Sequence, residues 1–218
     1  MGLKEKILYK LMGTNEEIET IYKQKGHCDE WVEAYKNGHP KMKVMDKLTL
    51  ADALVSLEKF DEAEALLESV NVGITADDIT KGTYFLVLIN LYIGQNRAAD
   101  ALAILEKHGK FLNIFYSAPA YQRMGGSFYD SAAVVLAMNG YHDDASRYYE
   151  LEKQWALKYD KTGIYPMITN VRLLKLVGNE EAAQNEAETA RNYINNYNGL
   201  DMPWQKKSFL KMLDKALN

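Results

Sequence analysis

A helical hairpin is predicted over residues 48–68 (LTLADALVSLEKFDEAEALLE), with a tight turn at residues 58–61. Related patterns recur further along the chain. A hairpin of this length cannot bury its apolar face alone, so its repetition favours a stack of hairpins, an α-solenoid, over a single closed core. The fold is therefore predicted to grow by the lateral addition of similar units.

Helix-forming residues dominate the rest of the chain, which predicts an all-α protein of about ten to twelve helices. The 218 residues include only four prolines, and runs that alternate apolar and polar residues are rare. A glycine that follows a periodic segment marks a predicted helix end, because glycine adopts the left-handed conformation at low cost. The glycines of this kind are Gly13, Gly26, Gly38, Gly94, Gly140 and Gly178.

We expect one continuous structural domain with three parts. Residues 1–40 are predicted to form irregular capping helices over 3–12, 16–25 and 29–36. Residues 41–198 contain four hairpins, and residues 199–218 form a C-terminal capping helix. Asp201 is the predicted cap of this last helix. The residues expected to face inward from it are Trp204, Leu210, Leu213 and Leu217.

Residues 109–126 interrupt the regular spacing and leave two alternatives open. Ser117 could cap a helix that starts at Ala118 and lengthens the helix carrying Ala133. Alternatively, the Gly125–Gly126 pair breaks that helix, because each glycine inside a helix costs about 1 kcal/mol relative to alanine.

An alanine follows each predicted turn between helices, and these alanines define a repeat. Ala63, Ala99, Ala145 and Ala183 are separated by 36, 46 and 38 residues. Five residues before them stand Glu58, Gly94, Gly140 and Gly178. On these features, and on the segments KFDEAEALLE and NRAADALAIL, the chain resembles the tetratricopeptide repeat family, with divergent repeats. The resemblance covers residues 42–195 and implies a right-handed solenoid in which the first helix of each hairpin faces a concave groove.

The composition excludes several classes of protein. The net charge of −4 argues against a dedicated nucleic-acid-binding protein, which usually carries a strongly basic face. The longest apolar run, residues 84–93, has half the length that a membrane span needs. A single cysteine, Cys28, fits a reducing compartment, and no signal peptide is recognisable, so we expect a cytoplasmic protein without a membrane span.

No group of residues argues for catalysis, a cofactor or a metal. Acidic pairs such as Asp61–Glu62 and Glu180–Glu181 fall at predicted helix starts, where they offset the positive end of the helix dipole. The four histidines stand at turns or helix ends, and no two have the spacing of a helical metal pair. The sequence also lacks a phosphate-binding glycine loop and a nucleophile elbow. We therefore expect a protein that is not an enzyme.

The candidate binding site follows from the resemblance, which places positions fifteen and eleven before each marker alanine in the groove, and the position eighteen before, where Tyr165 stands, is added to them. Fifteen tyrosines are many for this length, and tyrosine suits recognition because it offers a large contact area with few torsions to freeze. An apolar and aromatic groove with scattered polar contacts is therefore expected. Its candidate ligand-binding residues are Asp52, Tyr84, Leu88, Asp130, Val134, Tyr165, Ile168 and Arg172.

Such a groove predicts a scaffold or adaptor that binds a protein or peptide partner. A subunit that senses a signalling peptide is the main alternative. An enzyme on an α-solenoid, which would need a closed polar pocket with two titrating groups in contact, and an RNA-binding helical repeat are further alternatives. The identity of the partner and the oligomeric state stay open.

Overall fold

The computed structural model of the protein describes residues 16–73 and 76–218, and these residues form α-helices, one 3₁₀ helix and connecting turns, without a β-strand. The predicted all-α class is confirmed, and the eleven α-helices of the described residues agree with the predicted ten to twelve. The helix predicted over residues 3–12 lies outside the described residues. No described helix combines the length and the apolar character that crossing a membrane requires. The elements are α2 (Glu16–Lys25), α3 (Asp29–Gly38), α4 (Val44–Ser56), α5 (Phe60–Glu68), α6 (Asp78–Gly94), α7 (Ala98–Ser117), η1 (Gln122–Met124), α8 (Gly125–Met138), α9 (His142–Tyr159), α10 (Ile164–Leu176), α11 (Glu180–Asn196) and α12 (Gln205–Leu217).

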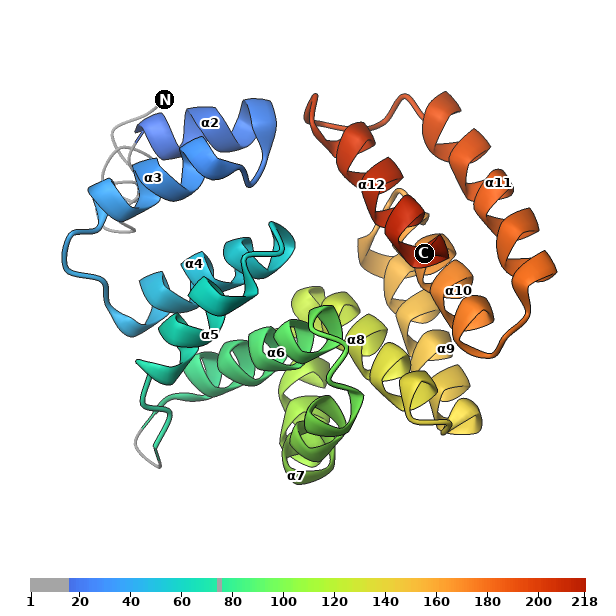
Figure 1. The fold of residues 1–218 in the computed structure, drawn as a ribbon, viewed down its shortest axis with the longest axis horizontal. Helices are drawn as coiled ribbons and strands as arrows, with labels where there is room; N and C mark the ends of the chain where they lie inside the picture. The colour runs from blue at the N-terminus through green and yellow to red at the C-terminus, as the bar shows by residue number, and fades with distance from the viewer. Residues whose placement is uncertain (1–15, 74–75) are drawn as a thin grey trace.

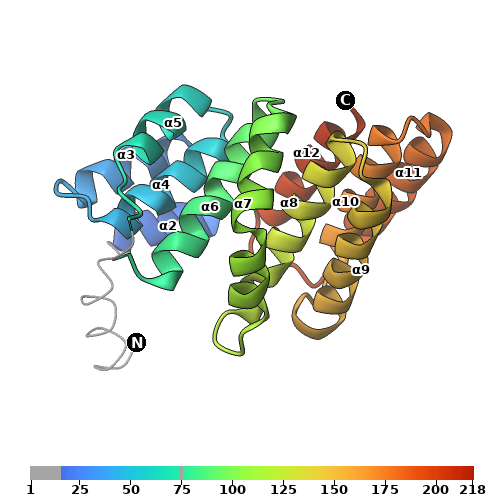
Figure 2. The ribbon, with the colours of Figure 1, turned by 90° about the horizontal axis from the view of Figure 1, so that it is seen from below.

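Successive helices pair as hairpins, and the hairpins follow one another around an arc (Figure 1). The first helices form a continuous row, because α4 contacts α6, α6 contacts α8, α8 contacts α10 and α10 contacts α12. Each second helix packs on its own first helix and on the first helix that follows. Figure 2 shows this progression from the N-terminal hairpin on one side to α11 on the other.

The two ends of the arc touch each other through α12 and the residues that precede it. The indole ring of Trp204 lies 5.2 Å from the ring of Tyr22. It also covers Gly26, where a β-carbon would stand 2.8 Å from the indole. Glu58, in the turn between α4 and α5, pairs with Lys215 of α12 at 3.1 Å. Contacts between the N-terminal and C-terminal parts of the described chain therefore join the two ends of the arc.

The start of the last helix differs from the prediction. The helix α12 begins at Gln205, and Asp201 does not cap it. Instead, the Gln205 side chain accepts a hydrogen bond from the Met202 N–H at 2.9 Å. Leu213 is fully buried as predicted.

Four hairpins share one turn conformation, which is the clearest sign of repetition in the structure. Its central residue has a positive φ in every case, at Glu58 (63°), Asn96 (56°), Gly140 (81°) and Gly178 (76°). The residue that follows each of them donates its N–H to the carbonyl five residues earlier, at 2.8–2.9 Å. This bond closes a Schellman motif, which satisfies the carbonyls left free at the end of the first helix.

The shared turn corrects the predicted repeat frame in the second hairpin. Ala99 is exposed, whereas Ala101 is fully buried and occupies the fourth position of α7, as Ala63 does in α5. The turn residue is Asn96, which tolerates the left-handed conformation, and not Gly94. Gly94 ends α6, where a β-carbon would lie 2.6 Å from the Phe60 ring. The structural repeat therefore runs through Ala63, Ala101, Ala145 and Ala183, with spacings of 38, 44 and 38 residues.

The structure also resolves the two alternatives for residues 109–126. The helix α7 continues to Ser117, a short turn and η1 follow, and α8 starts at Gly125. No helix starts at Ala118, so Ser117 is not a cap. The glycine pair opens α8, and the Trp155 ring lies against Gly126, where a β-carbon would stand 2.5 Å from that ring.

Replacing Asn96 by glycine is expected to stabilise the protein by about 0.5–1 kcal/mol, because glycine adopts a positive φ without the steric cost that asparagine pays. Gly140→Ala is the matched opposite change. No atom lies within 4 Å of the added β-carbon, so it should destabilise by about 1 kcal/mol through the backbone alone. Urea unfolding of the two variants measures both effects. A change in the free energy of unfolding in the same direction for both variants would contradict the shared left-handed turn.

Candidate functional site

The first helices enclose a cavity of about 470 Å³, here called the central cavity. Residues of α4, α6, α8, α9, α10 and α12 contribute to it, together with η1. Its size is typical of a small-ligand or side-chain pocket. The lining residues are Asp52, Ser56, Asn90, Arg123, Met124, Gly126, Ser127, Asp130, Ser131, Glu152, Trp155, Tyr165 and Met212.

A network of polar side chains occupies one wall of the central cavity. Thr169 Oγ1 lies 2.8 Å from Asp130 Oδ1 and 3.0 Å from Glu152 Oε1, so it bridges the two carboxyl groups. Arg172 Nη1 lies 3.6 Å from Asp130 Oδ1 and balances its charge. A hydroxyl carries only one proton, so Thr169 can donate to one carboxylate while the other carboxyl donates to it. This arrangement fits an ionised Asp130 beside a protonated Glu152.

Glu152 is the most unusual residue of this network, because only 1% of its surface is exposed. Burial raises the pKa of Glu152 well above its ordinary value, and the negative charge of Asp130 raises this pKa further. The bond to Thr169 and the positive charge of Arg172 only partly oppose this shift. Its second oxygen, Oε2, is buried and has no hydrogen-bond partner among the described residues. A buried oxygen without a partner costs about 1–3 kcal/mol, so it marks a position that a ligand could satisfy.

Asp52 adds a second acidic group from the opposite side, on α4. It is partly buried, and burial alone raises its pKa, because no basic side chain of the described residues offsets the lost hydration. Next to it along the row of first helices, Asn90 Oδ1 accepts a hydrogen bond from the Ser131 hydroxyl at 2.6 Å. The amide of Asn90 is thereby held in place on the cavity wall.

An aromatic wall and a polar rim complete the central cavity. The Trp155 Nε1–H donates to the Gln122 carbonyl at 3.0 Å, which fixes the indole against Gly126. Tyr165 lines the cavity and is 42% exposed, and its ring packs edge-on against Phe209 at 5.1 Å. Arg123 is exposed beside them.

The structure brings some of the predicted site residues together and separates others. Asp52, Asp130 and Tyr165 line the central cavity, and Arg172 contacts Asp130. The remaining four lie elsewhere: Tyr84, Leu88 and Ile168 belong to hydrophobic clusters between helices, and Val134 is 1% exposed beside a separate depression of about 270 Å³. Most of the residues that line the cavity are polar, in contrast to the apolar and aromatic groove expected from the sequence.

The sequence analysis missed most of the lining residues, and Asn90 and Glu152 show two different reasons. Asn90 stands eleven residues before Ala101, so the corrected repeat frame places it in the groove where the frame on Ala99 placed Leu88. Glu152 lies on α9, a second helix, where no groove residue was expected. Nothing in the surrounding charged segment distinguishes it from the exposed Glu150 two residues earlier.

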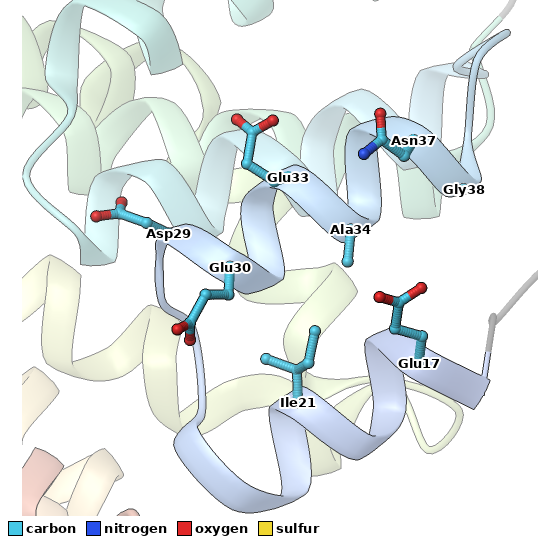
Figure 3. Close-up of a pocket in the computed structure, with 8 residues that line it drawn as sticks. All are labelled: Glu17, Ile21, Asp29, Glu30, Glu33, Ala34, Asn37 and Gly38. Atoms are coloured by element: carbon cyan, nitrogen blue, oxygen red, sulfur yellow. The ribbon is translucent and has the colours of Figure 1, made fainter.

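A shallower depression of about 510 Å³ lies between α2 and α3 and is lined partly by carboxylates (Figure 3). Its acidic side chains, Glu17, Asp29, Glu30 and Glu33, are all exposed. Glu30 pairs with Lys25 at 2.7 Å. None of the described residues that line this depression has a buried side-chain oxygen or nitrogen without a partner, so the central cavity is the stronger candidate for a binding site.

No cluster of three or more histidine, cysteine, aspartate or glutamate side chains in the described parts of the chain could hold a metal ion. Comparison of the chain with family models, with curated proteins and with solved structures found no significant match.

Proposed function

We infer that this protein is a scaffold that binds a peptide or a protein segment at its central cavity and does not itself catalyse a reaction. The proposal treats the four hairpins as divergent tetratricopeptide-like repeats of an α-solenoid. The turn shared by Glu58, Asn96, Gly140 and Gly178 supports this view, and so does the continuous row of first helices. In a solenoid of this kind the first helices form the recognition surface.

The observation that carries the proposal is the convergence of this row on one cavity that contains an unsatisfied buried carboxyl oxygen. Asp52, Asn90, Asp130 and Tyr165 come from four successive first helices. A ligand that contacts all four residues would therefore bind to four helices of the row at the same time. Partners of helical scaffolds are recognised by a few anchoring side chains in pockets of this kind.

Tyr165→Ala is expected to weaken peptide binding about tenfold or more, because Tyr165 supplies an exposed aromatic contact at the cavity. Tyr193→Ala is the matched control. Tyr193 is 41% exposed and also packs on a ring, Tyr197, but it does not line the cavity. A peptide array followed by titration of the strongest sequences measures both variants. The proposal is wrong if no peptide binds, or if the two variants lose affinity equally.

Acid–base catalysis is a second candidate function, and one observation favours it. A protonated Glu152 beside an ionised Asp130 resembles the pairs of carboxyl groups that serve as general acid and base. The scaffold is nevertheless the stronger proposal. The described residues that line the cavity include no histidine or cysteine. The Ser131 hydroxyl has one proton and two nearby acceptors, Asn90 Oδ1 at 2.6 Å and the Ser127 carbonyl oxygen at 2.7 Å, and neither acceptor is a base. Turnover that Glu152→Gln abolishes would favour catalysis.

A further inference from the structure

The charges around the central cavity indicate what kind of group it holds. Three acidic side chains line it, and they come from three different helices: Asp52, Asp130 and Glu152. Arg172 neutralises Asp130 at 3.6 Å, and Arg123 stands exposed at the rim. No ion pair joins a basic side chain of the described residues to Asp52 or Glu152, and the positive charge of Arg172 only partly offsets the burial of Glu152, so two acidic groups inside the cavity lack a close counter-charge.

An acidic cavity of this kind selects against anions and favours cations. Burial of an unpaired carboxylate is costly, and a ligand that brings a positive charge removes that cost. Glu152 Oε2 also needs a hydrogen-bond partner. A donor that carries a positive charge would satisfy both requirements, because charge-assisted hydrogen bonds are about twice as strong as neutral ones.

The geometry distinguishes between kinds of cation. The three carboxyl groups do not converge into a metal site, since no metal-binding cluster exists among the described residues. They are distributed around a volume of about 470 Å³, which suits an extended organic cation. Trp155 and Tyr165 provide aromatic surface, and cations are attracted to the faces of such rings.

We propose that the central cavity recognises an organic cation, a primary ammonium or a guanidinium group, held by Glu152 and Asp52 and flanked by Trp155 and Tyr165. This inference rests on the proposed function and makes it more specific. It identifies the side chain that anchors the bound segment as a lysine or an arginine. A free polyamine presents the same chemistry, and the experiment below separates the two sources.

Binding of the cation is also expected to release a proton from Glu152. In the free protein the environment keeps this carboxyl protonated at neutral pH, and a bound positive charge favours its ionised form. The other charged or titratable groups that act on Glu152 come from α8, α9, α10 and the connection after α9. They are Asp130, Tyr149, Asp160 and Arg172. Of Glu152 and these neighbouring groups, only Glu152 is both fully buried and carries a side-chain oxygen without a hydrogen-bond partner.

The test titrates the full chain by calorimetry with capped arginine, capped lysine, the neutral analogues citrulline and acetyl-lysine, and spermidine. The cations should bind, the neutral analogues should bind at least about tenfold more weakly, and proton release should appear as a buffer-dependent heat. Glu152→Gln should weaken cation binding about tenfold and abolish the proton release. Glu150→Gln, on the same helix but exposed, should change neither.

The possible outcomes distinguish a failure of the cation site from a failure of the scaffold function. Tighter binding of arginine- or lysine-containing peptides than of spermidine identifies a peptide anchor, and the reverse order identifies a free amine. In either case the cation site is supported. If array peptides bind but no cation competes with them, the cation assignment is wrong and the scaffold function stands. If spermidine binds and no peptide does, the scaffold function is wrong and the cation site stands. Equal binding of cations to wild type and to Glu152→Gln overturns the cation site, and thermal unfolding shows whether each variant is folded.

Discussion

Gly126→Ala should destabilise the protein by about 2 kcal/mol, a lowering of the melting temperature by about 4–8 °C for a chain of this size. A β-carbon at this position would stand 2.5 Å from the six-membered ring of Trp155, closer than any real contact. The indole cannot move away freely, because its Nε1–H donates to the Gln122 carbonyl at 3.0 Å. The variant must therefore break this hydrogen bond or separate α8 from α9.

Gly109→Ala provides the matched control, with the opposite sign. Gly109 is a buried glycine within α7, but a β-carbon there would meet Leu105 at 3.5 Å, an ordinary van der Waals contact. Alanine has the higher helix propensity, so this variant should gain about 0.5–1 kcal/mol. Thermal and urea unfolding of both variants tests the prediction. If Gly126→Ala were more stable than the wild type, the packing of Trp155 would not require a glycine at position 126.

Gly126 is one of four glycines against which an aromatic ring from another part of the chain packs. The rings of Trp204, Phe115, Phe60 and Trp155 lie against Gly26, Gly82, Gly94 and Gly126, with 2.5–2.8 Å between ring and β-carbon position. The sequence alone could not assign these pairs, because each pair joins residues that are distant in the sequence or belong to separate helices.

The all-α class and most helix positions could be predicted because helix periodicity and capping residues are local signals. The repeat frame of the second hairpin could not. Glycine is the usual residue at a left-handed turn, and Gly94 stood where it was expected, but Asn96 takes that conformation. Gly94 is needed instead for the close contact with Phe60. A two-residue error in frame was enough to select Leu88 in place of Asn90.

The candidate site was predictable only in part, for a related reason. Asp52, Asp130, Tyr165 and Arg172 follow from the position of first helices in a repeat, which is a property of the local pattern. Glu152 depends on how α9 packs against α8 and α10, and its neighbours in sequence are charged residues of an ordinary exposed face. Burial of a single charged residue is decided by tertiary packing and leaves no periodic signal.

The second large effect concerns Glu152 and the dependence of stability on pH. Its pKa in the folded protein lies above the value of 4.5 expected in an unfolded chain, since burial and Asp130 both favour the protonated form. The contribution of this raised pKa to the free energy of unfolding is fully present below pH 4.5. It is lost as the pH rises towards the pKa of Glu152 in the folded protein. The loss is about 1.4 kcal/mol per pH unit over that interval.

Glu152→Gln removes this titration while keeping the shape of the protonated acid. The variant should therefore gain stability relative to wild type as the pH rises, by about 2–3 kcal/mol between pH 4.5 and pH 7. The difference in unfolding free energy between variant and wild type, measured by urea unfolding across this interval, cancels the titration of groups common to both. Glu150→Gln, exposed on the same helix, should give a difference that does not change with pH. A constant difference for Glu152→Gln as well would mean that the carboxyl is solvated and ionised. The expected gain bears on the proposed cation site, because residues that lower stability are often found at binding sites. If the proposal is correct, a cation in the central cavity should restore in the wild type the stability that the buried carboxyl withholds.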